Sequence, residues 1–285
     1  MQRRRFDAMG TEVELFLDAD DERDALHRAE DELRRLEALL SRFRPNSELS
    51  QLNRSGRMRV GPELLEVTTV ALAARARTRG RFDPTVHDAL VAAGYDRTFD
   101  EIAELDGRAG HRPVACGGRV AVDHTTSTIE LEEGFRLDLG GIAKGWAVDR
   151  ALAGLAVHGP ALVNAGGDLA ACGRAWPVGV ETPRGTMTLE LRDGALATSG
   201  RDRRSWRRDG GERHHLIDPG TGVPAEGDLL TVTVTARSAT EAEVLAKQLF
   251  LAGDLQAAVA EADGKAIPAV LVSRDGATVL AGGLR

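Results

Sequence analysis

The chain has 285 residues, 42% of them hydrophobic, and its 37 basic and 44 acidic residues give a formal net charge of −7. This composition predicts a soluble globular protein that can bury a large core, as one large domain or two small ones. A negative net charge without a basic stripe argues against binding to a nucleic acid backbone. No apolar run approaches the roughly 18 residues that a membrane span needs.

The start of the chain and the cysteines bear on the compartment. The basic residues 3–5 lead directly into an alternating, strand-like pattern and not into an apolar signal region. Cys116 and Cys172 show no CxxC spacing and no neighbouring histidine at zinc-ligand intervals, which favours buried free thiols. The sequence therefore predicts a cytoplasmic protein.

In the first third of the chain, the spacing of the apolar residues changes from a strand pattern to a helix pattern. Residues 11–17 alternate as in a strand, whereas residues 21–40 carry leucines at helical spacing. A second long helix is expected over residues 64–76 and ends before Gly80. Residues 84–93 fit a short third helix.

The middle of the chain returns to a period of two. Residues 119–123 and 127–131 alternate on either side of a polar turn, which predicts a hairpin. The glycine pair at 140–141 then breaks a strand and opens a helix that continues to about residue 157.

The second half is predicted to be largely antiparallel sheet. Ser238 and Glu241 form a capping box before one late helix. Asp-Gly pairs between β-branched runs are strong hairpin signals, and they occur at 193–194, 209–210 and 275–276. Because no internal repeat or linker-like tract is present, we expect a single integrated α+β module over residues 1–285, with helices packed on the sheet.

Lysine is rare, and its positions are informative. Only Lys144, Lys247 and Lys265 contribute lysine to the 37 basic residues. In residues 137–145, Asp138 ends a strand, a glycine pair forms the turn, and Lys144 lies in the first turns of a helix. Glycine N–H groups, a helix N-terminus and a lysine together favour phosphate binding. When the segment stands alone, a tight turn with a surface lysine is the better explanation, and the segment matches neither a P-loop nor a Rossmann motif.

Three other features carry weaker signals. Residues 164–168 place two glycines between an amide and a carboxylate, which fits a ligand-approach loop or a plain turn. His214 and His215 precede a Pro-Gly-Thr-Gly turn, where an imidazole can transfer protons, although at least one of the two is expected to be structural. Glu243 and Lys247 share one helix face, which by itself predicts an ordinary surface ion pair.

Taken in order, eight segments resemble the FAD:protein FMN transferases, the ApbE family of flavin transferases, over nearly the whole chain. The segments are residues 8–11, 40–47, 80–85, 138–144, 164–168, 198–200, 215–222 and 242–247. The resemblance implies an ApbE-like, T-fold-like α+β fold. It also implies a metal-dependent transfer of FMN from FAD to a Thr or Ser hydroxyl of a partner protein, with release of AMP. The acceptor site on that partner would have the pattern Asp-Gly-x-Thr or Asp-Gly-x-Ser.

The resemblance assigns roles to individual residues. His215 would be the acid/base and Lys144 a further catalytic group. A catalytic role for Lys247 is our own prediction, because the family pattern has no lysine at that position. A magnesium ion (Mg2+) would lie near the backbone carbonyl of Gly141 and at Glu243. The FAD contacts would be Met9, Phe43, Arg81, Phe82, Asp83, Asp138, Lys144, Leu216 and Ile217.

The sequence departs from the family pattern at the implied metal. The pattern has Asp and, four residues later, Thr, where this chain has Glu243 and Lys247. An ammonium cannot coordinate a cation, whereas magnesium prefers oxygen ligands. Either other ligands hold the metal, or Lys247 supplies part of its charge, or the site is degenerate.

Two alternative functions stay open at this point. One is hydrolysis of FAD to FMN and AMP, with water in place of the acceptor hydroxyl, and the other is FAD binding without turnover. The chain itself contains Asp-Gly-Ala-Thr at 275–278, which begins like the acceptor pattern. A hairpin turn explains this segment better, because apolar strand-like runs flank it.

Overall fold

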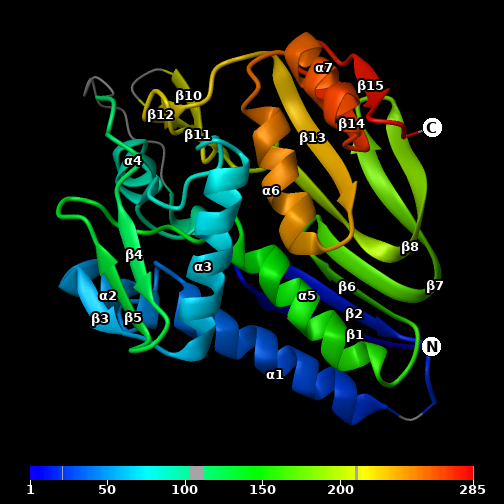
Figure 1. The fold of residues 1–285 in the computed structure, drawn as a ribbon. Coiled ribbons are helices and arrows are strands. Elements are labelled where there is room, and N and C mark those ends of the chain that lie inside the picture. Colours follow the sequence, from blue (N-terminus) through cyan, green and yellow to red (C-terminus); the bar gives the residue numbers. More distant parts are fainter. Residues whose placement is uncertain (21, 103–111, 209–210, 285) are drawn as a thin grey trace. The chain divides into compact units, whose positions relative to one another are not determined.

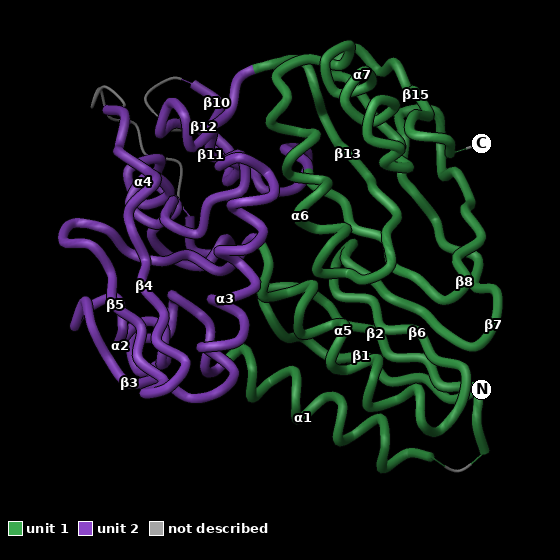
Figure 2. The backbone as a smooth tube through the Cα atoms, in the orientation of Figure 1, with its two compact units in different colours: residues 1–37, 142–199, 227–285 green, residues 38–141, 200–226 purple. Residues whose placement is uncertain are grey.

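The computed structural model describes residues 1–20, 22–102, 112–208 and 211–284. The chain forms two compact units, each described by itself below (Figure 2). Unit 1 comprises residues 1–37, 142–199 and 227–285, and unit 2 comprises residues 38–141 and 200–226. The expected single integrated module stays a prediction.

The described residues form the following helices and strands (Figure 1). The helices are α1 (Arg23–Leu40), α2 (Glu48–Ser55), α3 (Pro62–Arg77), α4 (His87–Ala92), the 3-10 helix η1 (Phe99–Glu101), α5 (Ala143–Ala156), α6 (Ala239–Phe250) and α7 (Leu255–Lys265). The strands are β1 (Gln2–Ala8), β2 (Thr11–Leu17), β3 (Arg57–Arg59), β4 (Val120–Asp123), β5 (Thr128–Leu131), β6 (Ala161–Ala165), β7 (Asp168–Thr182), β8 (Gly185–Gly200), β9 (Ser205–Arg208), β10 (Gly211–His214), β11 (Ile217–Asp218), β12 (Val223–Pro224), β13 (Leu229–Ala236), β14 (Ala269–Ser273) and β15 (Thr278–Ala281).

Unit 1 is built on an eight-stranded sheet with the order β1-β2-β6-β7-β8-β13-β14-β15. Its hairpin neighbours pair antiparallel, as in β1–β2, β6–β7, β7–β8 and β14–β15. Helices α5 and α6 pack on each other and on strands of this sheet. The predicted α+β class with a largely antiparallel sheet is therefore confirmed.

Unit 2 is built from short elements. Strands β3, β5 and β4 form a three-stranded sheet, while β9–β10 and β11–β12 are two-stranded hairpins. The predicted hairpin of residues 119–131 is confirmed by the antiparallel pairing of β4 with β5. No helix of the described residues in either unit is both long and apolar enough to cross a membrane.

The predicted helices are confirmed with small shifts, and the described residues also form α2, α7 and the 3-10 helix η1. The first predicted helix begins at Arg23 as α1, and residue 21 lies outside the described residues. Its leucines face the core because their spacing follows the helical turn, with Leu33 and Leu36 fully buried. The prediction of only one late helix is wrong, because α7 follows α6. The polar helix α2 was not predicted either.

The Asp-Gly pairs have different outcomes. The pair at 275–276 lies in the turn of the β14–β15 hairpin, as predicted. The pair at 193–194 is not a turn, because β8 continues through it and the hairpin closes at residues 183–184. Asp193 adopts a φ of 48° beside a register shift between β7 and β8 and accepts a hydrogen bond from the Gly173 N–H, which marks a bulge. The pair at 209–210 lies outside the described residues, although the flanking β9 and β10 pair antiparallel.

The cysteines are less buried than expected. Neither forms a disulfide, as predicted, but both are half-buried. Burial nevertheless raises the pKa of the Cys116 thiol to about 11, with nearby Asp83 adding to the rise.

Candidate functional site

An aromatic cluster in unit 2 surrounds Tyr95, in the turn after α4. The Tyr95 ring lies 5.4 Å from Phe43 and 5.6 Å from Trp206, measured between ring centroids. The His215 ring meets it edge-on at 6.5 Å. Buried Ile217 belongs to the same apolar cluster. Three residues predicted for the flavin site, Phe43, His215 and Ile217, are thus brought together.

A buried ion pair lies beside this cluster. The Arg42 Nε is 2.6 Å from the Asp138 Oδ2, and both side chains are less than a tenth exposed. Arg42 also donates a hydrogen bond to the Tyr95 carbonyl (2.6 Å), and its guanidinium lies over the Phe43 and Tyr95 rings at 4.2 and 4.7 Å. The other Asp138 oxygen accepts from the Gly140 N–H at 2.8 Å. Asp138 therefore connects the aromatic cluster to the glycine turn before α5.

The two adjacent histidines have different surroundings. His214 is buried, its Nδ1 accepts from the Leu216 N–H (3.3 Å), and its Nε2 lies 2.9 Å from the Ala225 carbonyl. These partners fix a neutral tautomer with the proton on Nε2, so His214 is the structural one. The half-buried His215 places Nδ1 3.4 Å from the Arg204 carbonyl. Because a carbonyl only accepts, Nδ1 carries the proton and Nε2 the lone pair of the neutral ring.

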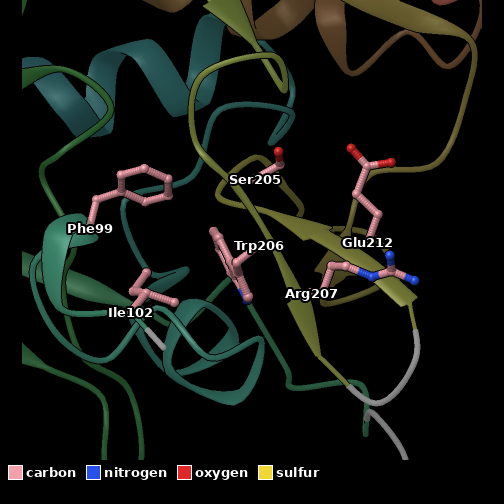
Figure 3. A pocket seen from close by; sticks show the side chains of 6 residues that line it. All are labelled: Phe99, Ile102, Ser205, Trp206, Arg207 and Glu212. Atoms are coloured by element: carbon pink, nitrogen blue, oxygen red, sulfur yellow. The ribbon is translucent and has the colours of Figure 1, made fainter. Parts of the chain in front are cut away.

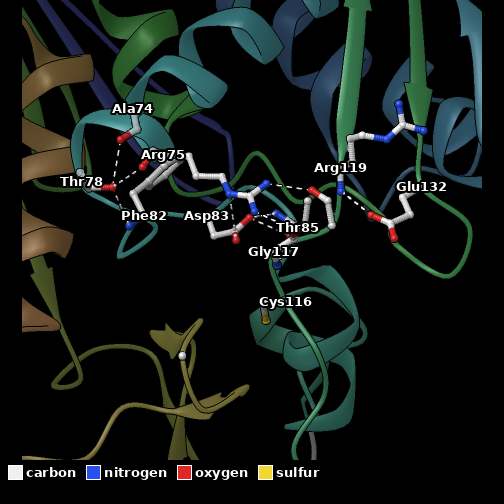
Figure 4. A network of polar contacts seen from close by, with 12 residues as sticks. Ala74, Arg75, Thr78, Phe82, Asp83, Thr85, Cys116, Gly117, Arg119 and Glu132 are labelled. Atoms are coloured by element: carbon white, nitrogen blue, oxygen red, sulfur yellow. Dashed lines mark hydrogen bonds and ion pairs between the residues drawn. The ribbon is translucent and has the colours of Figure 1, made fainter.

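The segment after α3 is held by its own network (Figure 4). The buried Asp83 accepts hydrogen bonds from the Thr85 N–H and hydroxyl at 2.8 and 2.7 Å, and its other oxygen lies 3.4 Å from the Arg75 Nε. Phe82 is buried and its N–H donates to Thr78, whereas Arg81 is exposed. Of these three predicted contacts, the Asp83 side chain is thus occupied within the loop, the Phe82 side chain is buried, and Arg81 alone is exposed.

A pocket of about 600 Å³ opens beside Trp206 in unit 2 (Figure 3). Phe99, Ile102 and Trp206 supply its apolar wall, and Ser205, Arg207 and Glu212 supply the polar one. The Trp206 indole N–H donates to the Ala93 carbonyl at 2.9 Å, which fixes the ring between pocket and cluster. This volume is in the range of small-molecule sites.

Unit 1 carries a group of four buried or half-buried charges. The Lys144 ammonium lies 2.6 Å from the Asp168 carboxylate, and the Lys247 ammonium lies 3.1 Å from the Glu243 carboxylate. Both carboxylates are 2% exposed. Burial raises the pKa of the Glu243 carboxyl, Asp168 adds to the rise, and Lys247 and Lys144 oppose it. The pairing of Lys247 with Glu243 is confirmed, but it is not the ordinary surface pair that the spacing alone suggests, because α6 turns this face into unit 1.

Glu243 also caps a neighbouring helix. Its Oε2 accepts a hydrogen bond from the Gly145 N–H in the first turn of α5, at 3.0 Å. In return, Asp149 of α5 accepts from the Ala239 and Thr240 N–H groups at the start of α6, at 2.7 and 2.9 Å. The two helices approach closely because residue 145 is glycine, whose Cβ would lie 2.6 Å from the Ala239 carbonyl oxygen. The Gly145 N–H at the start of α5, which was expected to bind phosphate, thus donates its hydrogen bond to a carboxylate of the chain itself.

Two hairpin turns complete the described site segments of unit 1. Met9 and Gly10 form the two-residue turn between β1 and β2 with φ of 57° and 66°. Within residues 164–168, Gly166 and Gly167 form the tight turn between β6 and β7, and a Cβ on Gly166 would lie 2.0 Å from the Thr11 hydroxyl. The turn places Asp168 against Lys144, and a role of this segment in ligand binding stays a prediction.

The residues around Glu243 do not fit a magnesium ion. One Glu243 oxygen accepts from the Gly145 N–H, and the other faces the Lys247 ammonium. The nearby Asp168 carboxylate faces Lys144. Magnesium needs oxygen ligands in octahedral geometry, and ammonium groups offer none. Among the described residues, no group of three or more acidic, His or Cys side chains could hold a metal.

The sequence missed several residues of these two groups. Arg42 lies inside the segment 40–47 but was not predicted to belong to the site. Its position directly before Phe43 is the sequence feature that could have indicated it. Tyr95 and Trp206 are more than a hundred positions apart, so no sequence pattern relates them. Asp168 was noticed only as part of a turn.

Comparisons with known proteins agree with the resemblance. The sequence profile of the ApbE family matches residues 9–271. The FAD:protein FMN transferase of Treponema pallidum is 32% identical over 252 residues, covering 78% of this chain and 69% of that protein. The FAD:protein FMN transferase of Vibrio cholerae is 28% identical over 250 residues, covering 82% and 74%.

Solved structures show the same fold. The crystal structure of the ApbE protein from Thermotoga maritima superposes with a TM-score of 0.84 at 28% identity, covering 98% of this chain and 96% of that one. The apo flavinyl transferase ApbE of Pseudomonas stutzeri gives a TM-score of 0.81 at 23% identity, covering 98% and 94%. The predicted ApbE-like fold is confirmed, and the profile match and the Treponema relative establish that this chain belongs to the ApbE family.

Proposed function

We propose that this chain is an FAD:protein FMN transferase, which moves FMN from FAD to a Thr or Ser hydroxyl of a partner protein and releases AMP. The observation that carries the proposal is the likeness, over most of the chain, to relatives with this name. The unit 2 cluster agrees with it, because aromatic faces suit a flavin ring and a half-buried imidazole suits proton transfer.

His215 acts as the general base in the proposed reaction. The acceptor hydroxyl oxygen attacks the phosphorus of the FMN half, and its proton passes to the Nε2 of His215. The bond from this phosphorus to the bridging oxygen breaks, and AMP leaves with that oxygen and its electron pair. The chain's task is to position the groups and to stabilise charge on the diphosphate.

The FAD contacts remain those implied by the resemblance. Arg42 and Asp138 position the loop that carries the aromatic cluster. The resemblance implies Lys144 as the cation for the diphosphate. The proposed contacts are Met9, Phe43, Arg81, Phe82, Asp83, Asp138, Lys144, Leu216 and Ile217. The implied magnesium stays a prediction without a fitting donor set, and no step is assigned to it.

The decisive experiment incubates the purified chain with FAD and a peptide or domain carrying Asp-Gly-x-Thr. Covalent FMN on the acceptor, detected by intact mass, together with AMP in equal amount, supports the transferase. AMP and FMN released without labelled acceptor indicate hydrolysis of FAD. FAD binding without AMP release indicates a binding protein, and either result contradicts the proposal.

We expect the chain to bind FAD more tightly than FMN or riboflavin. Only FAD carries the second phosphate, for which the resemblance implies contacts at the glycine turn of residues 140–141 and at Lys144. Isothermal titration with the three flavins measures the difference, which we expect to be at least about tenfold in Kd. Equal affinities would remove the diphosphate from the recognition.

We expect no self-modification at Thr278, despite the Asp-Gly-Ala-Thr segment. Thr278 begins β15 and pairs with Val272 of β14, while Asp275 accepts hydrogen bonds from Ser273 and from the Ala277 N–H within the turn. A residue fixed in a sheet cannot enter an active site as a flexible acceptor. Intact mass after incubation with FAD and magnesium checks this, and FMN mapped to Thr278 would show the opposite.

A further inference from the structure

Two lysine–glutamate pairs of this chain have the same helical spacing and opposite surroundings. On α6, the side chains of Lys247 and Glu243 are 16% and 3% exposed, with 3.1 Å between ammonium and carboxylate. On α7, the Lys265 side chain is 52% exposed and lies 2.8 Å from Glu261. The α7 pair is an ordinary surface contact. The α6 pair is buried, where removing either partner leaves an uncompensated charge.

The α6 pair is also part of a larger balanced group. Glu243 accepts the Gly145 N–H on one oxygen and faces Lys247 with the other, while Asp168 nearby faces Lys144. Two carboxylates and two ammonium groups therefore neutralise one another. A divalent cation at Glu243 would lie against the Lys247 ammonium, and like charges at that distance repel strongly where water is excluded.

We propose that the Lys247 ammonium takes the place of a divalent cation at Glu243, so that this chain binds the FAD diphosphate without a metal. The inference deepens the proposed transferase function and rests on it for the identity of the ligand. An ammonium supplies one positive charge and donates hydrogen bonds, so it can neutralise the carboxylate and face a phosphate oxygen. It cannot bridge several oxygens as a metal does. FAD binding in this chain should thus be insensitive to chelators.

The first test uses manganese as a paramagnetic probe on the protein without FAD. Electron paramagnetic resonance should show no manganese bound through Glu243 in the wild type, so Glu243→Gln should leave the spectrum unchanged. Lys247→Thr frees the carboxylate and adds a hydroxyl oxygen, and it should acquire one manganese ion. Lys265→Thr, the matched change on α7, should acquire none. A wild-type manganese ion that Glu243→Gln removes would overturn the proposal.

The second test measures the Kd for FAD with magnesium and with a chelator. The Kd for FAD of the wild type and of Lys265→Thr should change less than about twofold between the two conditions. Lys247→Thr should bind FAD at least about tenfold more weakly without metal. The role of Lys247 would be overturned if the wild type binds FAD tenfold more weakly when the metal is chelated. It would also be overturned if a folded Lys247→Thr protein binds FAD equally well with magnesium and with the chelator. If Lys247→Thr does not fold, the effect of the chelator on FAD binding by the wild type decides the proposal alone. A chain that binds no FAD contradicts the proposed function instead, while the manganese experiment still judges the site.

Discussion

Asp138→Ala should lower the free energy of unfolding by about 3–5 kcal/mol and weaken FAD binding, because it leaves the Arg42 guanidinium buried without its anion. The pair joins two side chains less than a tenth exposed at 2.6 Å, and Asp138 also holds the Gly140 N–H of the turn before α5. Urea denaturation gives the first quantity and isothermal titration with FAD the second. Glu130→Ala is the matched control, since its pair with Arg57 is largely exposed and should contribute less than about 1 kcal/mol.

A double-mutant cycle separates the ion pair from the rest of the loop. Arg42→Ala removes the same pair from its other side, together with the contact to the Tyr95 carbonyl. If the pair carries the effect, Arg42→Ala combined with Asp138→Ala should cost clearly less than the two single changes added together. Additive costs, or an Asp138→Ala protein as stable as the wild type, would show that the buried pair does not organise this loop.

His215→Ala should reduce the rate of FMN transfer by about 10²–10⁴-fold, the usual contribution of a positioned general base. FAD binding should change little, because the imidazole takes the acceptor's proton and the change removes an interaction of the transition state. Single-turnover AMP release and titration with FAD separate the two quantities.

His214→Ala is the control for His215→Ala, because it changes the adjacent histidine, to which no catalytic role is assigned. His214 is buried, and its ring bridges the Leu216 N–H and the Ala225 carbonyl. Its loss should lower stability, since two buried polar groups lose their partner. Wild-type transfer by His215→Ala with a competent acceptor would refute the assignment of the base.

Local patterns of the sequence determined most of the elements. The leucine spacing of α1, the Ser238 capping box of α6 and the turn at 275–276 each depend on residues within a few positions of one another. Such interactions are complete within one helix turn or one hairpin, so they are visible without the rest of the chain. The order of the motifs was also sufficient to recognise the ApbE family.

Tertiary structure decided which polar residues are buried and with which partners. The i,i+4 spacing of Glu243 and Lys247 is the same in a surface pair, and only the packing of α6 on α5 makes it a buried one. Asp193-Gly194 has the sequence of a hairpin turn, yet pairing with β7 turns it into a bulge. Tyr95 and Trp206 meet across more than a hundred residues, and no local rule relates them. Burial and long-range pairing depend on contacts between distant segments, whereas spacing along one element depends on neighbours alone.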